Sequence, residues 1–187
     1  MRTTLNLIKE KRPCSPGWET LLIGLGKTQA DDEPLSIAKI IETNDVRDAL
    51  WALRAVVGYD REKRLLACWC CDQIAHLITD ERSKNAVVVA RKFANGEASR
   101  EELSAAAAAA ASAADDASAS ADASAADDAA AAAYAAAAYA AAAYSSAAVV
   151  GAGAYFASRA AQATELLRIC SCVDRGEDPY PKQGEEK

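Results

Sequence analysis

Apolar residues recur every three to four positions through the first hundred residues, the spacing of one buried face of an α-helix. The clearest run consists of Val46, Ala49, Leu50, Leu53 and Val57, which follows the i, i+3, i+4, i+7 pattern. No stretch alternates apolar and polar residues with a period of two, so we expect no sheet. The pattern predicts an all-α protein, either a multi-helix bundle or a short helical array.

Capping and stop signals set the boundaries of the predicted helices. The expected starts lie at Ser15-Pro16, Pro34, Asn44 or Asp45, Asp60, Ser83 and Ser99, and the expected stops at Gly24 or Gly26, Gly58 and Asn95-Gly96. Ser99 and Glu102 form a capping box, in which each side chain accepts from the other residue's backbone N–H. The alanine-rich helix is expected to return through a final helix over residues 155–172, which brings Phe156, Leu166, Leu167 and Ile169 back toward the core.

An alanine block from Ser104 to Ala154 contains almost nothing but Ala, Ser, Asp and three tyrosines. Alanine is the best helix former and has no side-chain chemistry, so the block predicts a long scaffold helix. One narrow stripe of that helix, counted at 100° per residue, lacks Ser and Asp and is the expected packing face. The stripe consists of Leu103, Ala107, Ala110, Ala114, Ala121, Ala125, Ala132 and Tyr139.

The length of 187 residues favours one domain with tails. We expect a single all-helical domain over residues 1–173, with a short-helix part over 5–98 and an alanine-rich part over 99–173. The Pro- and charge-rich segment 174–187 is expected to be disordered. The net charge of −6 lacks the basic footprint of a nucleic-acid binder, so no direct nucleic-acid binding is expected.

Residues 129–158 carry no charge, and the run is longer than the roughly 20 residues that a bilayer span needs. Most of the run is alanine, which lacks the favourable insertion energy of Leu, Ile, Phe or Val. A small-residue helix packed within a bundle is therefore preferred, and a membrane span is the alternative. The first twelve residues lack an apolar signal-peptide core, and adjacent cysteines do not suit a disulfide framework, so a cytoplasmic location is expected.

The glycine-rich stretch Gly-Leu-Gly-Lys-Thr at residues 24–28 resembles the end of a phosphate-binding loop. A complete loop would need a glycine where Leu21 stands, and a strand rather than a helical pattern before it. The preferred interpretation is a helix stop followed by a basic residue, without nucleotide binding.

The cysteines and the only histidine raise the question of a zinc site. The candidate ligands are Cys68, Cys70, Cys71, His76, Cys170 and Cys172. On a helix Cys68 and Cys71 share a face while Cys70 points away, whereas structural zinc sites use turns that bring sulfurs together. Buried cysteine also behaves as a small apolar residue. We therefore prefer core packing and expect no metal and no cofactor.

His76 lies four residues after Asp72, so the two side chains can pair on one helix face. A histidine with such a partner can act as a general base. No candidate nucleophile stands at motif spacing from it. A surface pair is the preferred interpretation, and we assign no catalytic residue.

Acidic residues and tyrosines of the alanine block form the candidate partner-binding surface. The candidate residues are Asp115, Asp116, Asp127, Asp128, Tyr134, Tyr139 and Tyr144. Successive tyrosines are five positions apart and therefore rotated by 140°, so at least one should stay on the surface near the acidic faces. The alternative is a solvated face that keeps an alanine-rich helix soluble.

Three motifs carry a resemblance to a known group of proteins. Residues 44–56 read NDVRDALWALRAV, residues 64–70 read RLLACWC, and residues 95–99 read NGEAS before the alanine block. They resemble alanine-rich helical proteins of phages, prophages and bacteria, some of which are labelled immunity proteins. The likeness covers about residues 5–172, although this chain departs from it by being nearly pure Ala with Tyr.

The resemblance implies an all-helical intracellular protein concerned with phage–host or toxin–antitoxin conflict, in the host-cell cytoplasm if phage-encoded. It brings no catalytic residues. The leading hypothesis is a non-enzymatic protein-binding protein that docks on a macromolecular partner. The alternatives are a small-ligand or metal-binding helical protein, using the helix at residues 68–76 and a cavity beside it, and a structural or membrane-associated phage component.

Overall fold

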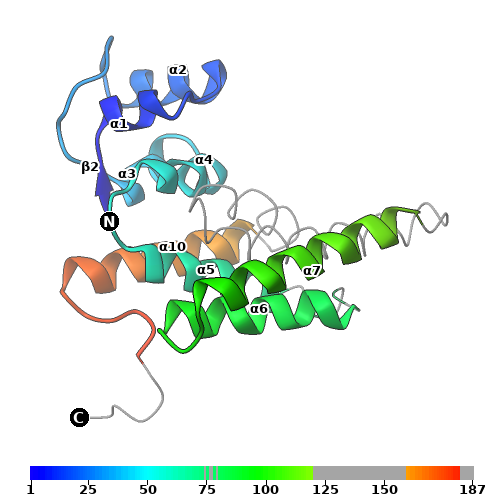
Figure 1. Ribbon diagram of the computed structural model, residues 1–187. Coiled ribbons are helices and arrows are strands. Elements are labelled where there is room, and N and C mark those ends of the chain that lie inside the picture. Colours follow the sequence, from blue (N-terminus) through cyan, green and yellow to red (C-terminus); the bar gives the residue numbers. More distant parts are fainter. Residues whose placement is uncertain (74, 76–77, 79, 120–158, 182–187) are drawn as a thin grey trace. The chain divides into compact units, whose positions relative to one another are not determined.

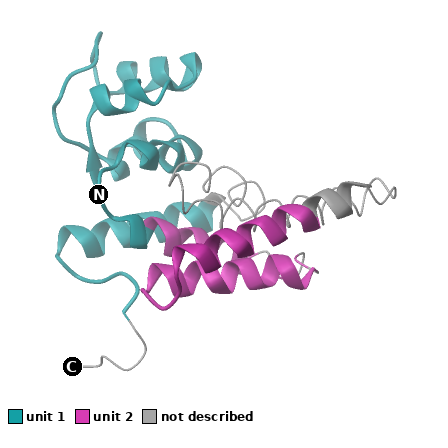
Figure 2. Cartoon of the chain, in the orientation of Figure 1, with its two compact units in different colours: residues 1–62, 159–187 teal, residues 63–158 magenta. Residues whose placement is uncertain are grey.

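The structure, a computed structural model, describes residues 1–73, 75, 78, 80–119 and 159–181, with only the backbone for residues 114–119 and 159. The described residues are mostly helical, with one two-stranded sheet (Figure 1). The predicted all-α class is confirmed. Backbone contacts divide the chain into two compact units (Figure 2).

Unit 1 combines residues 1–62 with residues 159–187, and unit 2 comprises residues 63–158. The sequence analysis instead predicts one domain whose parts divide at residue 98. Helical periodicity shows which face of a helix is buried, but it does not show which helix covers that face. The sequence predicts that the final helix returns toward the core, and Leu166 and Ile169 are buried while Leu167 is exposed, but the pattern does not show that this helix joins the N-terminal helices.

Unit 1 contains short helices and a minimal sheet. Its elements are β1 (Arg2–Thr3), α1 (Leu5–Glu10), α2 (Ser15–Gly24), β2 (Leu35–Ser36), α3 (Ile37–Thr43), α4 (Val46–Ala52), a 3-10 turn η1 (Leu53–Ala55) and α10 (Arg159–Asp174). Helix α3 packs on α2 and α4, and α10 packs on α3 and α4 (Figure 1). The core residues, none more than 1% exposed, are Leu5, Ile37, Ile40, Leu50, Leu53, Leu166 and Ile169.

Polar side chains cap the helices of unit 1 where the sequence places them or close by. The Asp45 carboxylate accepts from the backbone N–H of Asp48 at 2.9 Å, so Asp45 caps α4. Helix α2 begins at Ser15 with Cys14 in the cap position, one residue before the expected start. Ser36 caps α3, so the helix expected from Pro34 begins three residues later.

The delay at Pro34 has a structural cause, because residues 35 and 36 form a strand. Strand β2 pairs antiparallel with β1, with Arg2 opposite Ser36 and Thr3 opposite Leu35. The Thr3 hydroxyl also donates to the carbonyl of Ala55 at 2.6 Å. The expectation of no sheet is wrong in this detail, since a two-residue strand is too short to show any period.

The tail after α10 also differs from the expectation. Arg168 donates to the carbonyl of Pro179 at 3.0 Å, and the Tyr180 hydroxyl donates to Glu165 at 2.9 Å. Arg61 donates to the carbonyl of Tyr180 at 2.7 Å. Residues 175–181 are therefore held on unit 1 by the contacts of Tyr180, Arg61 and Arg168. The composition of this segment had predicted disorder. Residues 182–187 lie outside the described part.

Unit 2 contains most of α5 (Asp60–Gln73), together with α6 (Glu81–Ala94) and α7 (Arg100–Ala119). Helices α6 and α7 form a helical hairpin (Figure 1). Its turn is the predicted one: Asn95 caps α6, and Gly96 follows with a φ of +77°.

The predicted capping box at the start of α7 is confirmed. The backbone N–H of Ser99 donates to Glu102 at 2.7 Å, and the backbone N–H of Glu102 donates to the Ser99 hydroxyl at 3.1 Å. The predicted cap of α6 is wrong. Asp80 caps that helix by accepting from the backbone N–H of Arg82, and Ser83 is fully buried inside it.

The packing face of α7 is rotated from the predicted stripe. Among the side chains of α7 that the structure describes, the buried ones are Leu103, Ala106, Ala110 and Ala113, at the 3-4-3 spacing of a coiled-coil seam. Leu103 and Ala110 are predicted correctly, whereas Ala107 is only half-buried. The side chains of Ala114, Ala121, Ala125, Ala132 and Tyr139 lie outside those that the structure describes.

Candidate functional site

The predicted docking surface falls largely outside the described residues. Asp115 and Asp116 lie near the end of α7, where only the backbone is described. Asp127, Asp128, Tyr134, Tyr139 and Tyr144 lie beyond it, as does the uncharged run 129–158. The docking surface therefore stays a prediction. Within the described part of the chain, no helix has both the length and the apolar character to cross a bilayer.

The glycine-rich stretch at residues 24–28 is a helix stop, as preferred from the sequence. Gly26 has a φ of +66°, and the backbone N–H of Lys27 donates to the carbonyl of Leu22 at 2.9 Å. The Lys27 ammonium binds Asp31 and Glu33, and these hydrogen bonds raise its pKa. Its positive charge is therefore matched within the protein.

The cysteine helix is packed as a core element. Cys68 is buried, its thiol lies 3.8 Å from the carbonyl oxygen of Val87, and burial raises its pKa to about 12. Among the described residues no group of three or more metal-binding side chains converges. Asp72 pairs with Arg91 at 2.6 Å, while its predicted partner His76 is outside the described part.

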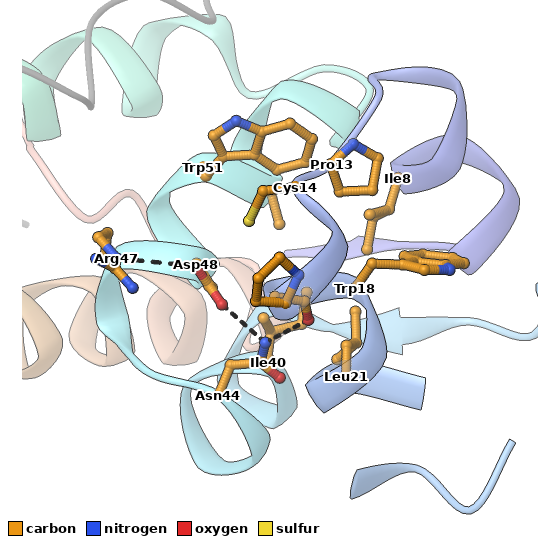
Figure 3. A pocket seen from close by; sticks show the side chains of 13 residues that line it. Ile8, Pro13, Cys14, Trp18, Leu21, Ile40, Asn44, Arg47, Asp48 and Trp51 are labelled. Atoms are coloured by element: carbon orange, nitrogen blue, oxygen red, sulfur yellow. Dashed lines mark hydrogen bonds and ion pairs between the residues drawn. The ribbon is translucent and has the colours of Figure 1, made fainter. Parts of the chain in front are cut away.

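Unit 1 is hollowed between α1, α2, α3 and α4 by a cavity of about 430 Å³ (Figure 3). This volume lies within the range of small-ligand pockets. The apolar part of its wall consists of Ile8, Pro13, Pro16, Trp18, Leu21, Ile40, Trp51 and Ala52. The remaining wall residues are Cys14, Gly17, Asn44, Arg47 and Asp48. Such an apolar wall with a few polar groups is typical of a binding site.

The local sequence at residues 13–18 builds one side of this cavity. Pro13 precedes Cys14, the cap residue of α2, and Pro16 stands in the first turn, where a missing N–H costs no helical hydrogen bond. Trp18 follows in the same turn, and Trp51 lies near the end of α4. Two large aromatic side chains therefore reach one space from different helices.

Asn44 ties the start of α2 to α4. Its side-chain amide donates to the carbonyl of Gly17 and to Asp48 Oδ2, both at 2.8 Å (Figure 3). The opposite amide orientation would place Asn44 Oδ1 against two acceptors, so these contacts fix the orientation. A Cβ on Gly17 would lie 2.9 Å from Asp48 Oδ2, so the absent side chain permits this close approach.

The rim of the cavity carries both signs of charge. The Asp48 side chain is 25% exposed, and its Oδ1 atom lies 3.9 Å from Arg47 Nε. Arg47 is 70% exposed and lies 3.8 Å from Asp45 on its other side. Both contacts are ion pairs whose N···O distances are longer than a hydrogen bond.

The Trp51 ring is already in contact with a cation. The Arg54 guanidinium lies over it, 5.4 Å from the ring centre. A cation over an aromatic face is an attractive arrangement that also holds the ring in place. The arrangement therefore offers a preformed apolar space, aromatic surface and a half-buried carboxylate.

Sequence reasoning did not single out Trp18, Trp51 or Asp48. One signal was available: Gly17 is a poor helix former, yet it stands in the first turn of a predicted helix between Pro16 and Trp18. A glycine there indicates a close backbone approach. The partner of that approach, Asp48, is 31 positions away and was not visible.

A second hollow of about 410 Å³ lies beside β2. Its charged residues include Lys27 and Lys39, which pair with acidic residues of the same unit. Arg2 also lines this hollow, which has much less apolar wall than the tryptophan-lined cavity.

No family model, curated protein or solved structure matches the chain. The resemblance to alanine-rich phage proteins stays a prediction from the sequence motifs. Function is therefore argued from the residues of the tryptophan-lined cavity.

Proposed function

We propose that this protein is a binding protein whose site is the tryptophan-lined cavity of unit 1, and that its ligand is small and largely apolar. The observation that carries the proposal is a space of about 430 Å³ between Trp18 and Trp51 with the carboxylate of Asp48 at its rim. It is the small-ligand hypothesis of the sequence analysis, moved from the cysteine helix to α2, α3 and α4.

Preorganisation supports this proposal. The hydrogen bonds of Asn44 to Gly17 and Asp48 hold the two tryptophan-bearing helices in register without a ligand. A site that is already ordered loses little conformational entropy on binding, so more of the contact energy appears as affinity.

Docking on a macromolecule through residues 115–144, as in a phage-conflict or immunity-type protein, is the leading hypothesis from the sequence and is kept as the second candidate function. Its acidic side chains and tyrosines favour a basic partner, with binding that weakens as salt rises. A pull-down from host extract, repeated with Asp115/Asp116/Asp127/Asp128→Asn, tests it independently of the cavity.

Cys14 offers a direct test of the cavity, because it is exposed and lines the wall. The other described cysteines are buried except Cys172, which Cys172→Ser removes from the assay. The full-length protein is incubated with a set of small disulfides and a thiol under exchange conditions, and adducts are measured by mass spectrometry. We expect compact apolar groups to be retained at Cys14 far above their share in the set.

The control compares the same set on the unfolded protein and on Trp18→Ala, which removes one aromatic wall. Both should show little selectivity among the disulfides, while circular dichroism shows that Trp18→Ala still folds. An identical retention order on folded and unfolded protein would contradict the proposed function, because it would show that the cavity contributes nothing.

A further inference from the structure

We infer that the ligand of the tryptophan-lined cavity is a small organic cation, a protonated or quaternary amine, with Asp48 as its counter-charge. The inference rests on the proposed function and adds the chemical class of the ligand. It follows from the charges at the rim, from the unused oxygen of Asp48 and from the aromatic wall.

The charges at the rim favour a cation. The charged residues of the cavity wall are Arg47 and Asp48, 3.9 Å apart, and Arg47 is also paired at 3.8 Å with Asp45, which lies outside the wall. Arg47 is 70% exposed, so water and salt screen its charge, whereas Asp48 is only 25% exposed. The less screened charge that a ligand meets at the rim is therefore the Asp48 carboxylate, which is complementary to a cation.

The hydrogen bonds of Asp48 leave one acceptor for a ligand. Its Oδ2 atom accepts from Asn44, while Oδ1 accepts no hydrogen bond from any residue that the structure describes. The Arg47 contact to Oδ1, at 3.9 Å, is too long to be one. A protonated amine can donate a hydrogen bond to this oxygen, whereas a quaternary ammonium meets the carboxylate through charge alone.

The aromatic wall suits the carbon groups of an amine. Tryptophan is the side chain that attracts cations most strongly through its ring face. Trp51 already has Arg54 over its ring, whereas no cation in the described residues lies over Trp18. Methyl groups of an amine can contact Trp18 and Pro16 while the positive charge faces Asp48.

Three probes of one shape and different charge test the inference on the full-length protein. Choline carries a positive charge, 3,3-dimethylbutan-1-ol is its neutral counterpart, and 3,3-dimethylbutanoate carries a negative charge. Affinities are measured by ligand-observed NMR, and protection of Cys14 from alkylation locates the bound probe. We expect choline to bind roughly five- to thirtyfold more tightly than the alcohol, and the anion to bind most weakly.

Asp48→Asn removes the charge and keeps an oxygen that can accept from Asn44. It should lower choline affinity several-fold toward that of the alcohol, because only the attraction of the Trp18 ring remains, and leave the affinity of the alcohol unchanged. Asp32→Asn is the matched control, because Asp32 is an exposed acid of the same unit outside the cavity wall. It should change none of the three affinities.

The outcomes separate this inference from the proposed function. Equal affinity for all three probes, or tightest binding of the anion, would overturn the inference that the ligand is a cation. The cavity would still stand as a binding site. Absence of choline binding alongside selective retention of disulfides at Cys14 would do the same. Failure of the disulfide experiment would instead remove the cavity itself.

Discussion

Gly17 determines the wall of the cavity by having no side chain. The space that its Cβ would need is occupied by Asp48 Oδ2, 2.9 Å away, and by the Cys14 sulfur, 3.2 Å away. The Asp48 carboxylate cannot move aside without loss of its hydrogen bond from Asn44. Glycine is therefore required at position 17 by the position of Asp48 in the cavity wall, and not by the helix itself.

Gly17→Ala should lower the free energy of unfolding by about 1 kcal/mol. The new Cβ would displace Asp48 Oδ2 and break its hydrogen bond from Asn44, and this loss outweighs the gain in helix propensity. In an Asp48→Ala background the same change should be neutral or stabilising. Urea unfolding of the four proteins gives the coupling energy. An unchanged effect of Gly17→Ala in both backgrounds would show that the contact with Asp48 is not the constraint.

Ser83 places a hydroxyl in the core of unit 2, fully buried and without a hydrogen-bond partner among the described residues. Ser83→Ala should therefore raise the free energy of unfolding by about 1 kcal/mol, because a desolvated and unpaired polar group is removed. Ser99→Ala, which removes the cap of α7, should lower it by about as much. Opposite signs in urea unfolding confirm the two assignments, and a loss of stability in both argues for a hidden partner of Ser83.

The Cys68 thiol predicts a pH dependence. Burial raises its pKa from 9.0 to about 12, so in this range the unfolded chain releases the proton while the folded protein keeps it. Stability from this group is complete below pH 9 and falls as pH rises from 9 to 12. Cys68→Ala should reduce the slope of stability against pH in that range. Equal slopes for both proteins, measured by urea unfolding, would contradict the raised pKa.

At the scale of elements, local signals predicted what local interactions determine. The capping box of Ser99 and Glu102, the stop at Gly96 and the cap at Asp45 each involve residues within four positions. The face of α7 could not be predicted as well, because alanine has the same hydrophobicity at every position. Only the positions of Ser and Asp distinguished one side of the helix from another. They placed the packing face one residue away from its true position, at Ala107 instead of Ala106.

The corrected face of α7 is tested at its centre. Ala110 is fully buried on the helical hairpin with α6, whereas Ala108 is exposed. Ala110→Leu should overpack a close helix–helix contact and cost about 1–3 kcal/mol. Ala108→Leu should have little effect. The measurement is thermal unfolding by circular dichroism, and equal melting temperatures would show that the face is assigned wrongly.

At the scale of the whole molecule, the candidate site and the extent of unit 1 depend on residues far apart in the sequence. Trp18 and Trp51 meet across a cavity, and α10 joins helices that precede it by more than a hundred residues. Periodicity contains no information on such pairings. The same limit applies to the tail, since Tyr180 is predicted as a disordered residue until its contact with Glu165 is known.

The closing of unit 1 by its distant helix is tested at two neighbouring leucines. Leu166 is fully buried in unit 1, whereas Leu167 is 41% exposed on the same helix. Leu166→Ala should lower the free energy of unfolding by about 2–5 kcal/mol, because it removes transfer energy and leaves a cavity in the core of unit 1. Leu167→Ala makes the same change in helix propensity on the same helix, and it should lower the free energy of unfolding far less. If the two variants unfold at the same urea concentration, α10 does not contribute to the core of unit 1, and the described packing of that unit is wrong.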